Sequence, residues 1–245
     1  MRELLQNPEV VRLLSLGKDG LLFAIWETCY VTVIATFFAY VIGLPLGVLM
    51  VAGEEGGVRP LPRPVMSALN VIINILRSVP FLILMVLVIP LSRVILGTSI
   101  GTVATIIPLI VAAFPFVARL VEASIREVDK GVVEAAQSMG CSPLQIIAKV
   151  MIPESRPSLI SGFTTAFITI LSYGAMALNL GYQRRMNIIL WVSVVVLVIL
   201  VQIFQSIGTC LAVRFDRRIG PGGKRRRRKE TGQDIQRERK IPGTM

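Results

Sequence analysis

Five apolar runs, each long enough to cross a lipid bilayer, constrain the fold of this chain more than any other feature of its sequence. They cover about residues 21–50, 67–91, 99–121, 158–178 and 188–213. A membrane helix needs about 20 predominantly apolar residues, and a bilayer offers no water to backbone groups, so each run is expected to be helical. Because 53% of the residues are hydrophobic and only 17% are charged, we predict an all-α, polytopic membrane protein with five transmembrane helices.

The two ends of the chain differ from this membrane domain, residues 21–213. Residues 1–20 interleave Leu and Val with charges, which predicts an amphipathic segment at an interface. The first apolar run is too long for a signal-peptide core and should stay as an anchor. Residues 214–245 carry most of the excess positive charge, including the run 224–229. This tail is expected to be disordered and attracted to anionic membrane lipid; directly after a membrane span, that is a better interpretation than nucleic-acid binding.

The basic residues set the orientation of the chain in the membrane. Five crossings put the N- and C-termini on opposite sides. Without the tail, Lys and Arg residues divide equally between the two sides, so the tail decides. We therefore expect a cytoplasmic C-terminus, an external N-terminus, and cytoplasmic positions for the loop 53–64 and the polar segment 130–153.

The polar segment 130–153 is predicted to be two short helices joined by a tight turn. Gly140 ends the first helix, because glycine readily adopts the left-handed conformation that closes one. Ser142 and Gln145 have the spacing of a capping box at the start of the second helix. Pro153 and Pro157 are expected to stop that second helix before the next apolar run begins.

Arg77 is the charge that stands out inside an apolar run. A guanidinium at that depth costs about 2.5 to 3.5 kcal/mol on insertion scales unless it faces a partner or water. We therefore expect it to face the protein interior, either as an ion-pair partner that holds the second span or as a lining group of a pathway. Glu27 and Glu122 are the candidate partners. Of the two roles, the sequence favours the structural one over contact with a substrate.

The composition gives little support for an enzyme. The chain has no His, and its three Cys residues are scattered, which predicts neither a disulfide framework nor a metal site. No nucleophile and base stand out as a catalytic pair, and no cofactor is implied. The sequence GPGGKRRR at 220–227 lacks the glycine spacing and the Ser or Thr of a phosphate-binding loop. This chain is therefore not expected to bind ATP itself, and a membrane pathway with a docking segment and no nucleotide site needs a partner to supply energy.

The segment 130–153 also resembles a known motif. Glu134, Ala135 and Ala136, followed by Gly140 and then Pro153, are similar to the EAA loop of bacterial ABC importer permeases. The resemblance implies the type I permease fold of these importers. It also implies that residues 131–149 are a cytoplasmic coupling element that inserts into a cleft on the ATPase subunit.

Further segments are similar to the methionine-uptake branch of that family, and the similarity runs from about residue 26 to 215. They are GLPLGV at 43–48, ILRSVPFLIL at 75–84, IPLSRVILGTSIG at 89–101 and PFVARLVE at 115–122. The branch implies a bacterial inner-membrane complex of two copies of this chain, two ATPase subunits and an external lipoprotein that delivers D- or L-methionine or related derivatives. By the same resemblance, Met176 in the sequence SYGAM is the gate that closes the pathway at the dimer axis.

Two alternatives stay open from the sequence. One is a permease of the same fold for another small solute. The other is an ion-coupled transporter or channel that acts alone, although such proteins rely on acidic intramembrane groups, which are sparse here. The connection 177–187 is also shorter than is usual in the family, which bears on how the external lipoprotein docks.

Overall fold

The computed structural model describes residues 21–98, 100–181 and 187–215, and within helices it describes the side chains of 23–98, 100–173 and 195–215. These residues form helices joined by short connections, with no strand among them. The all-α prediction is therefore confirmed for the described part of the chain. The N-terminal segment 1–20, the tail from 216 onward and residues 182–186 of the short connection 177–187 lie outside the described residues.

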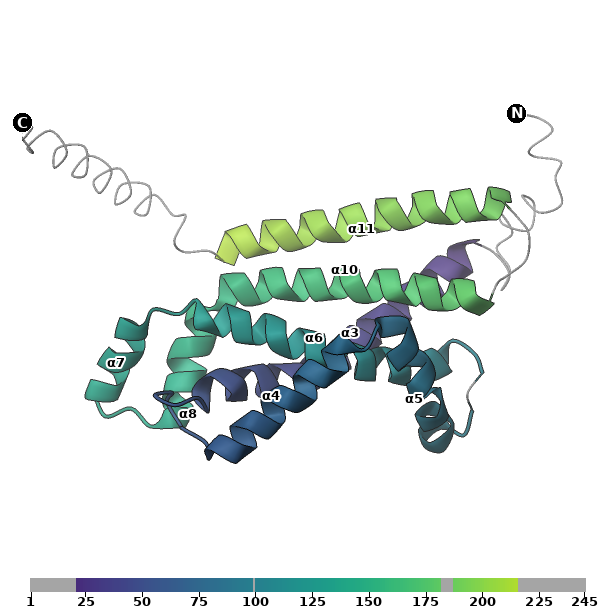
Figure 1. Ribbon diagram of the computed structural model, residues 1–245. Coiled ribbons are helices and arrows are strands. Elements are labelled where there is room, and N and C mark those ends of the chain that lie inside the picture. The colour runs from purple at the N-terminus through teal and green to yellow at the C-terminus, as the bar shows by residue number, and fades with distance from the viewer. Residues whose placement is uncertain (1–20, 99, 182–186, 216–245) are drawn as a thin grey trace, which may run out of the picture.

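Four long helices lie side by side and form the body of the molecule (Figure 1). They are α3 (Leu21–Ala52), α6 (Ile106–Arg126), α10 (Arg156–Gly181) and α11 (Asn187–Phe215). The helix α6 is preceded by a single 3₁₀ turn, η1 (Val103–Thr105). The most extensive packing is between α3 and α6, and α10 packs against α3, α6 and α11. These helices correspond to four of the five predicted spans.

The second predicted span is not one helix. It consists of α4 (Arg63–Ser78) and α5 (Phe81–Leu96), which meet at an angle of 106°. The break comes from Pro80, which has no N–H to donate and which disfavours the helical conformation of the residue before it. Val79 is accordingly extended, with φ −76° and ψ 127°. Three described helices are long and apolar enough to cross a membrane, or four when the bent pair counts as one, so the predicted number of five is not established.

Two glycines bring α3 and α6 into close contact. A Cβ on Gly47 would lie 2.5 Å from the carbonyl oxygen of Ala118, and a Cβ on Gly43 would lie 2.7 Å from Cγ1 of Val117. Small residues four apart let two membrane helices approach until their backbones touch. The helix α3 continues through Pro45, which lies between the two glycines.

The hydrophobic core lies between α3, α6 and α10 and extends into the segment that follows α6. Buried residues of all of these elements belong to one cluster: Val31, Ala35, Ala39, Val117, Val121, Ala136, Ile146, Met151, Ala166 and Ile170. Large apolar side chains also cover the outer faces of the long helices. In water such a surface would drive association, but in a bilayer it is the expected lipid-facing or subunit-facing surface.

Candidate functional site

The segment 130–153 forms a compact helical unit at one end of the bundle (Figure 1). Its first helix, α7 (Lys130–Ser138), begins after Asp129, whose carboxylate accepts a hydrogen bond of 2.7 Å from the backbone N–H of Gly131. The helix ends at a turn in which Gly140 has φ 75°. Any other residue is strained in that conformation, so the predicted role of Gly140 as a helix terminator is confirmed.

The second half of the segment begins as the sequence predicts but ends differently. The backbone N–H of Ser142 donates to the Gln145 side chain at 2.9 Å, as in a capping box, at the start of α8 (Pro143–Ile146). A π-helical turn, η2 (Ile147–Met151), and the short helix α9 (Ile152–Glu154) follow directly.

The helical path continues through Pro153 to Glu154 and ends at Ser155, between the two prolines expected to stop it. Pro153 itself therefore does not stop the helix. Pro153 lies in the first turn of α9, directly after the π-helical turn. The Ser155 hydroxyl donates to the carbonyl of Met151 at 2.8 Å, and α10 begins at the next residue. The segment therefore passes into α10 with only one residue between them.

The two faces of this unit have different environments. Ala136, Ile146 and Met151 are buried against the bundle. Glu134, Ala135 and Gly140 are exposed and Pro153 is partly exposed. Met139 and Leu144 are also on the surface, with 76% and 68% of their areas exposed. An outer face that combines a carboxylate with two exposed apolar side chains suits a protein partner better than it suits water.

Next to this unit, an ion-pair network joins α6 to the loop after α3. Arg126 bonds to Glu54 and, at 2.9 Å, to Glu122. Glu122 also pairs with Arg119 at 2.5 Å, and only 8% of its side chain is exposed. Sequence reasoning missed this network, although the spacing of Arg119, Glu122 and Arg126 on one helix face was visible in the sequence. It fixes the loop 53–62 and the polar segment at the same end of the molecule.

The network extends to α4 through Arg119. Its Nη2 donates to the side-chain oxygens of Asn70 at 3.1 Å and Asn74 at 2.8 Å. Asn70, Asn74 and Arg77 follow one another at the spacing of one helix face, so α4 carries a polar stripe through an otherwise apolar segment. Sequence reasoning singled out only the last of these three residues.

The side chain of Arg77 is exposed in the single chain, so no other part of the described chain covers it. Neither predicted partner binds it: Glu122 is held by two other arginines, and Glu27 accepts a hydrogen bond from the Thr102 hydroxyl. The physical reason is the break at Pro80, which ends α4 just after Arg77 and leaves this side chain in the last turn.

The predicted gate, Met176, lies in α10, in the part of that helix whose side chains the structure does not describe. The residue three positions earlier is described. The ring of Tyr173 stacks on Phe81, the first residue of α5, with ring centroids 3.8 Å apart and planes 14° apart. The break between α4 and α5 therefore lies beside the segment of α10 that leads into Met176.

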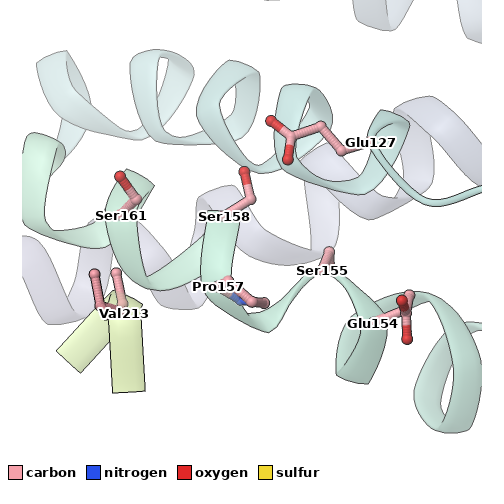
Figure 2. Close-up of a pocket in the computed structure, with 8 residues that line it drawn as sticks. Glu127, Glu154, Ser155, Pro157, Ser158, Ser161 and Val213 are labelled. Atoms are coloured by element: carbon pink, nitrogen blue, oxygen red, sulfur yellow. The ribbon is translucent and has the colours of Figure 1, made fainter. Parts of the chain in front are cut away.

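A cavity of about 310 Å³ opens near the junction of the polar segment with α10. Figure 2 shows Glu127, Glu154, Ser158 and Ser161 among the residues that line it, with Val213 of α11 on one side. Among the described residues, no group of three or more His, Cys, Asp or Glu side chains has an arrangement that could hold a metal ion. The described residues that line the cavity therefore present hydroxyl and carboxylate groups, without the arrangement of a metal centre.

Comparisons with known proteins agree with this architecture. The family model of binding-protein-dependent transport system inner membrane components matches residues 43–221. A probable D-methionine transport system permease protein, MetI, of Vibrio cholerae is 46% identical over 217 residues, which cover 83% of this chain and 96% of the relative. The D-methionine transport system permease protein MetI of Escherichia coli K12 is 45% identical over 152 residues, which cover 62% of this chain and 70% of the relative.

Solved structures give the same result. A chain of the MetNI methionine ABC transporter in an inward-facing conformation matches with a TM-score of 0.78 and 37% identity, over 86% of this chain and 99% of that chain. A second crystal form of that transporter gives a TM-score of 0.75 and 38% identity, over 79% and 94% of the two chains. An amino acid ABC transporter solved with histidines matches with a TM-score of 0.55 and 21% identity, over 84% of this chain and 100% of that chain. This match shows a shared fold alone.

Proposed function

Because this chain belongs to the family of binding-protein-dependent transport system inner membrane components, we propose that it is the membrane permease subunit of an ATP-driven importer for D- or L-methionine or a related amino acid. It has the all-α, type I permease fold of ABC importers. Two relatives that match this chain over 96% and 94% of their own length are named as probable D-methionine transport system permease proteins. These names are the observation that carries the substrate assignment. The chain moves solute and leaves ATP hydrolysis to a partner.

The proposed assembly contains two copies of this chain, two ATPase subunits and an external substrate-binding lipoprotein. The exposed outer face of the segment 130–153 supports an ATPase contact, because it is separated from the membrane helices and combines Glu134 with the apolar Met139 and Leu144. We assign the docking contact to Glu134, Ala135, Ala136, Gly140 and Pro153. The buried Ala136 acts by seating α7 on the bundle rather than by touching the partner.

The proposed topology has five crossings in the bacterial inner membrane, with the bent pair α4 and α5 as one of them. The C-terminus is cytoplasmic and the N-terminus is external. The bond between Glu54 and Arg126 supports this arrangement, because it holds the loop after α3 at the same end of the bundle as the docking segment. Both then lie on the cytoplasmic side with the basic tail.

The proposed mechanism is alternating access that the docking segment controls. When the ATPase subunits move, they displace α7 and α8. Ser155 and the helical path through α9 pass that displacement to α10, which carries Met176 at its other end. The hydroxyls of Ser158 and Ser124, 3.2 Å apart, join α10 to α6, so the two helices are expected to move together. Met176 closes the pathway in this scheme.

The test is co-purification of the chain with its ATPase and lipoprotein, followed by methionine-dependent ATP hydrolysis and uptake in vesicles. Glu134→Lys is expected to remove uptake while leaving membrane insertion intact, because it reverses the charge on the docking face. Glu134→Gln is the matched control, since it keeps the size of the side chain, and it should retain part of the uptake. Normal uptake by Glu134→Lys would contradict the docking assignment, and uptake of other solutes but not methionine would contradict the substrate.

A further inference from the structure

Arg77 is a cation within a membrane segment for which the described structure supplies no partner. It lies 14 residues beyond Arg63, the first residue of α4, which at a rise of about 1.5 Å per residue is about 21 Å along the helix axis. Measured from a membrane surface at Arg63, as the proposed topology has it, this position is inside a hydrocarbon layer about 30 Å thick. Among the described side chains, no ion pair or hydrogen bond engages its guanidinium. A charge at this depth needs a counter-charge or water.

Among the described residues, no carboxylate within the candidate membrane spans bonds to Arg77. Glu27 and Glu122 are the two described Asp or Glu residues that fall within those spans. Glu122 already pairs with two arginines, and Glu27 accepts a hydrogen bond from Thr102. Within one described chain, water or a bound anion is therefore left as the partner of Arg77.

The backbone next to Arg77 points to water rather than lipid. The helix is interrupted between Ser78 and Phe81, and Ser78 and Pro80 are exposed along with Arg77. A non-helical backbone at membrane depth is tolerated only where it is buried in protein or lines a water-filled cavity. Broken helices near the bilayer midplane are a recurrent way to build substrate sites in transporters.

The position of the break relative to α10 supports the same conclusion. The stacked rings of Phe81 and Tyr173 hold the start of α5 against α10, one helical turn before the proposed gate Met176. The face of α4 that carries Arg77 is polar along its length through Asn70 and Asn74. A polar stripe, an exposed break and an unpaired guanidinium thus lie together beside the gate segment.

We propose that Arg77 lines the aqueous transport pathway and binds the carboxylate of the amino acid in transit. The inference rests on the proposed function, since it requires an amino-acid substrate. A guanidinium can donate two parallel N–H hydrogen bonds to the two oxygens of one carboxylate. Arg77 would thereby give the permease its own selectivity for an anionic group, beside the selectivity of the external lipoprotein. This differs from the purely structural role that the sequence favours.

The test uses Ser78→Cys, in a background where Cys29, Cys141 and Cys210 are replaced by Ser, so that the reporter thiol lies next to an intact Arg77. The full complex in vesicles is labelled with an anionic, sulfonate-bearing methanethiosulfonate and with its cationic, trimethylammonium-bearing counterpart. We expect Arg77 to raise the ratio of the anionic to the cationic labelling rate. Arg77→Gln should lower that ratio about 25-fold, because a unit charge at 4 Å in water changes each rate about fivefold, in opposite directions. Added methionine should slow labelling only when Arg77 is present.

The controls separate failure of this inference from failure of the proposed function. Arg93→Gln removes an exposed arginine from the last turn of α5 and should change neither the charge ratio nor the protection, whereas Arg77→Lys should keep the ratio. A thiol at position 78 that neither reagent reaches, or a ratio unaffected by Arg77→Gln, would overturn the inference. Protection by methionine that persists without Arg77 would overturn it as well. A charge ratio that depends on Arg77, combined with no methionine uptake or protection, would instead refute the proposed substrate.

Discussion

Replacing Gly47 by Ala tests whether the close contact between α3 and α6 holds the membrane domain together. The added Cβ would lie 2.5 Å from the carbonyl oxygen of Ala118 and 2.7 Å from Cβ of Val121. The first of these atoms belongs to the backbone of α6 and has no rotamer to change. The methyl group is therefore accommodated only if the two helices move apart, which loosens the packing on both sides of the contact.

Two opposing effects set the size of the change in the free energy of unfolding. Ala is favoured over Gly inside a helix by about 1 kcal/mol, and overpacking costs about 1 to 3 kcal/mol. Because the clash is with backbone, the cost should fall at the upper end, which gives a net destabilisation of about 2 kcal/mol. For a domain of this size, that corresponds to a decrease in Tm of roughly 4 to 8 °C.

Gly162→Ala is the matched control in α10. A Cβ at this position would meet its nearest atoms, in Ser124, Leu120 and Tyr40, at 3.7 to 3.8 Å, which is ordinary contact. Only the gain in helix propensity remains, so Tm should stay the same or rise by roughly 2 to 4 °C. The measurement is thermal unfolding of the purified variants in detergent. Equal Tm values for Gly47→Ala and Gly162→Ala would refute the close-packed contact between α3 and α6.

Further predictions concern the ion pairs, the docking segment and the gate. Glu122→Gln should destabilise the chain by about 3 kcal/mol in the same thermal assay, because it leaves Arg119 partly buried without a carboxylate, whereas Glu127→Gln, outside that network, should change Tm little. Gly140→Ala should cost about 1 to 2 kcal/mol through its positive φ and should weaken co-purification with the ATPase. Leu144→Asp should abolish that co-purification without changing Tm, because the side chain is exposed in the isolated chain. Met176→Ala should let methionine leak from loaded vesicles without ATP, and tight vesicles would place the gate elsewhere.

Local signals in the sequence were enough to predict most of the docking segment. The positive φ of Gly140 and the hydrogen bond between Ser142 and Gln145 follow from the intrinsic preferences of these residues and from a spacing of three positions. Where the helical path ends was less predictable. The π-helical turn lies directly before Pro153, and Ile146 and Met151 beside it are buried in the bundle. Contacts of that kind with distant residues are not encoded at short range.

By itself, the sequence determined that this chain is an all-α membrane protein with a capped polar segment between its apolar runs, because helix formation in lipid and helix capping depend on composition and on residues a few positions apart. The tertiary structure decided what depends on distant residues: that Gly43 and Gly47 seat α3 against α6, that Arg119 reaches across to α4, and that the two predicted carboxylates are engaged away from Arg77. Packing alone decides which groups across the bundle come within bonding distance. For this reason, only the folded chain showed Arg77 as an exposed cation beside a broken helix.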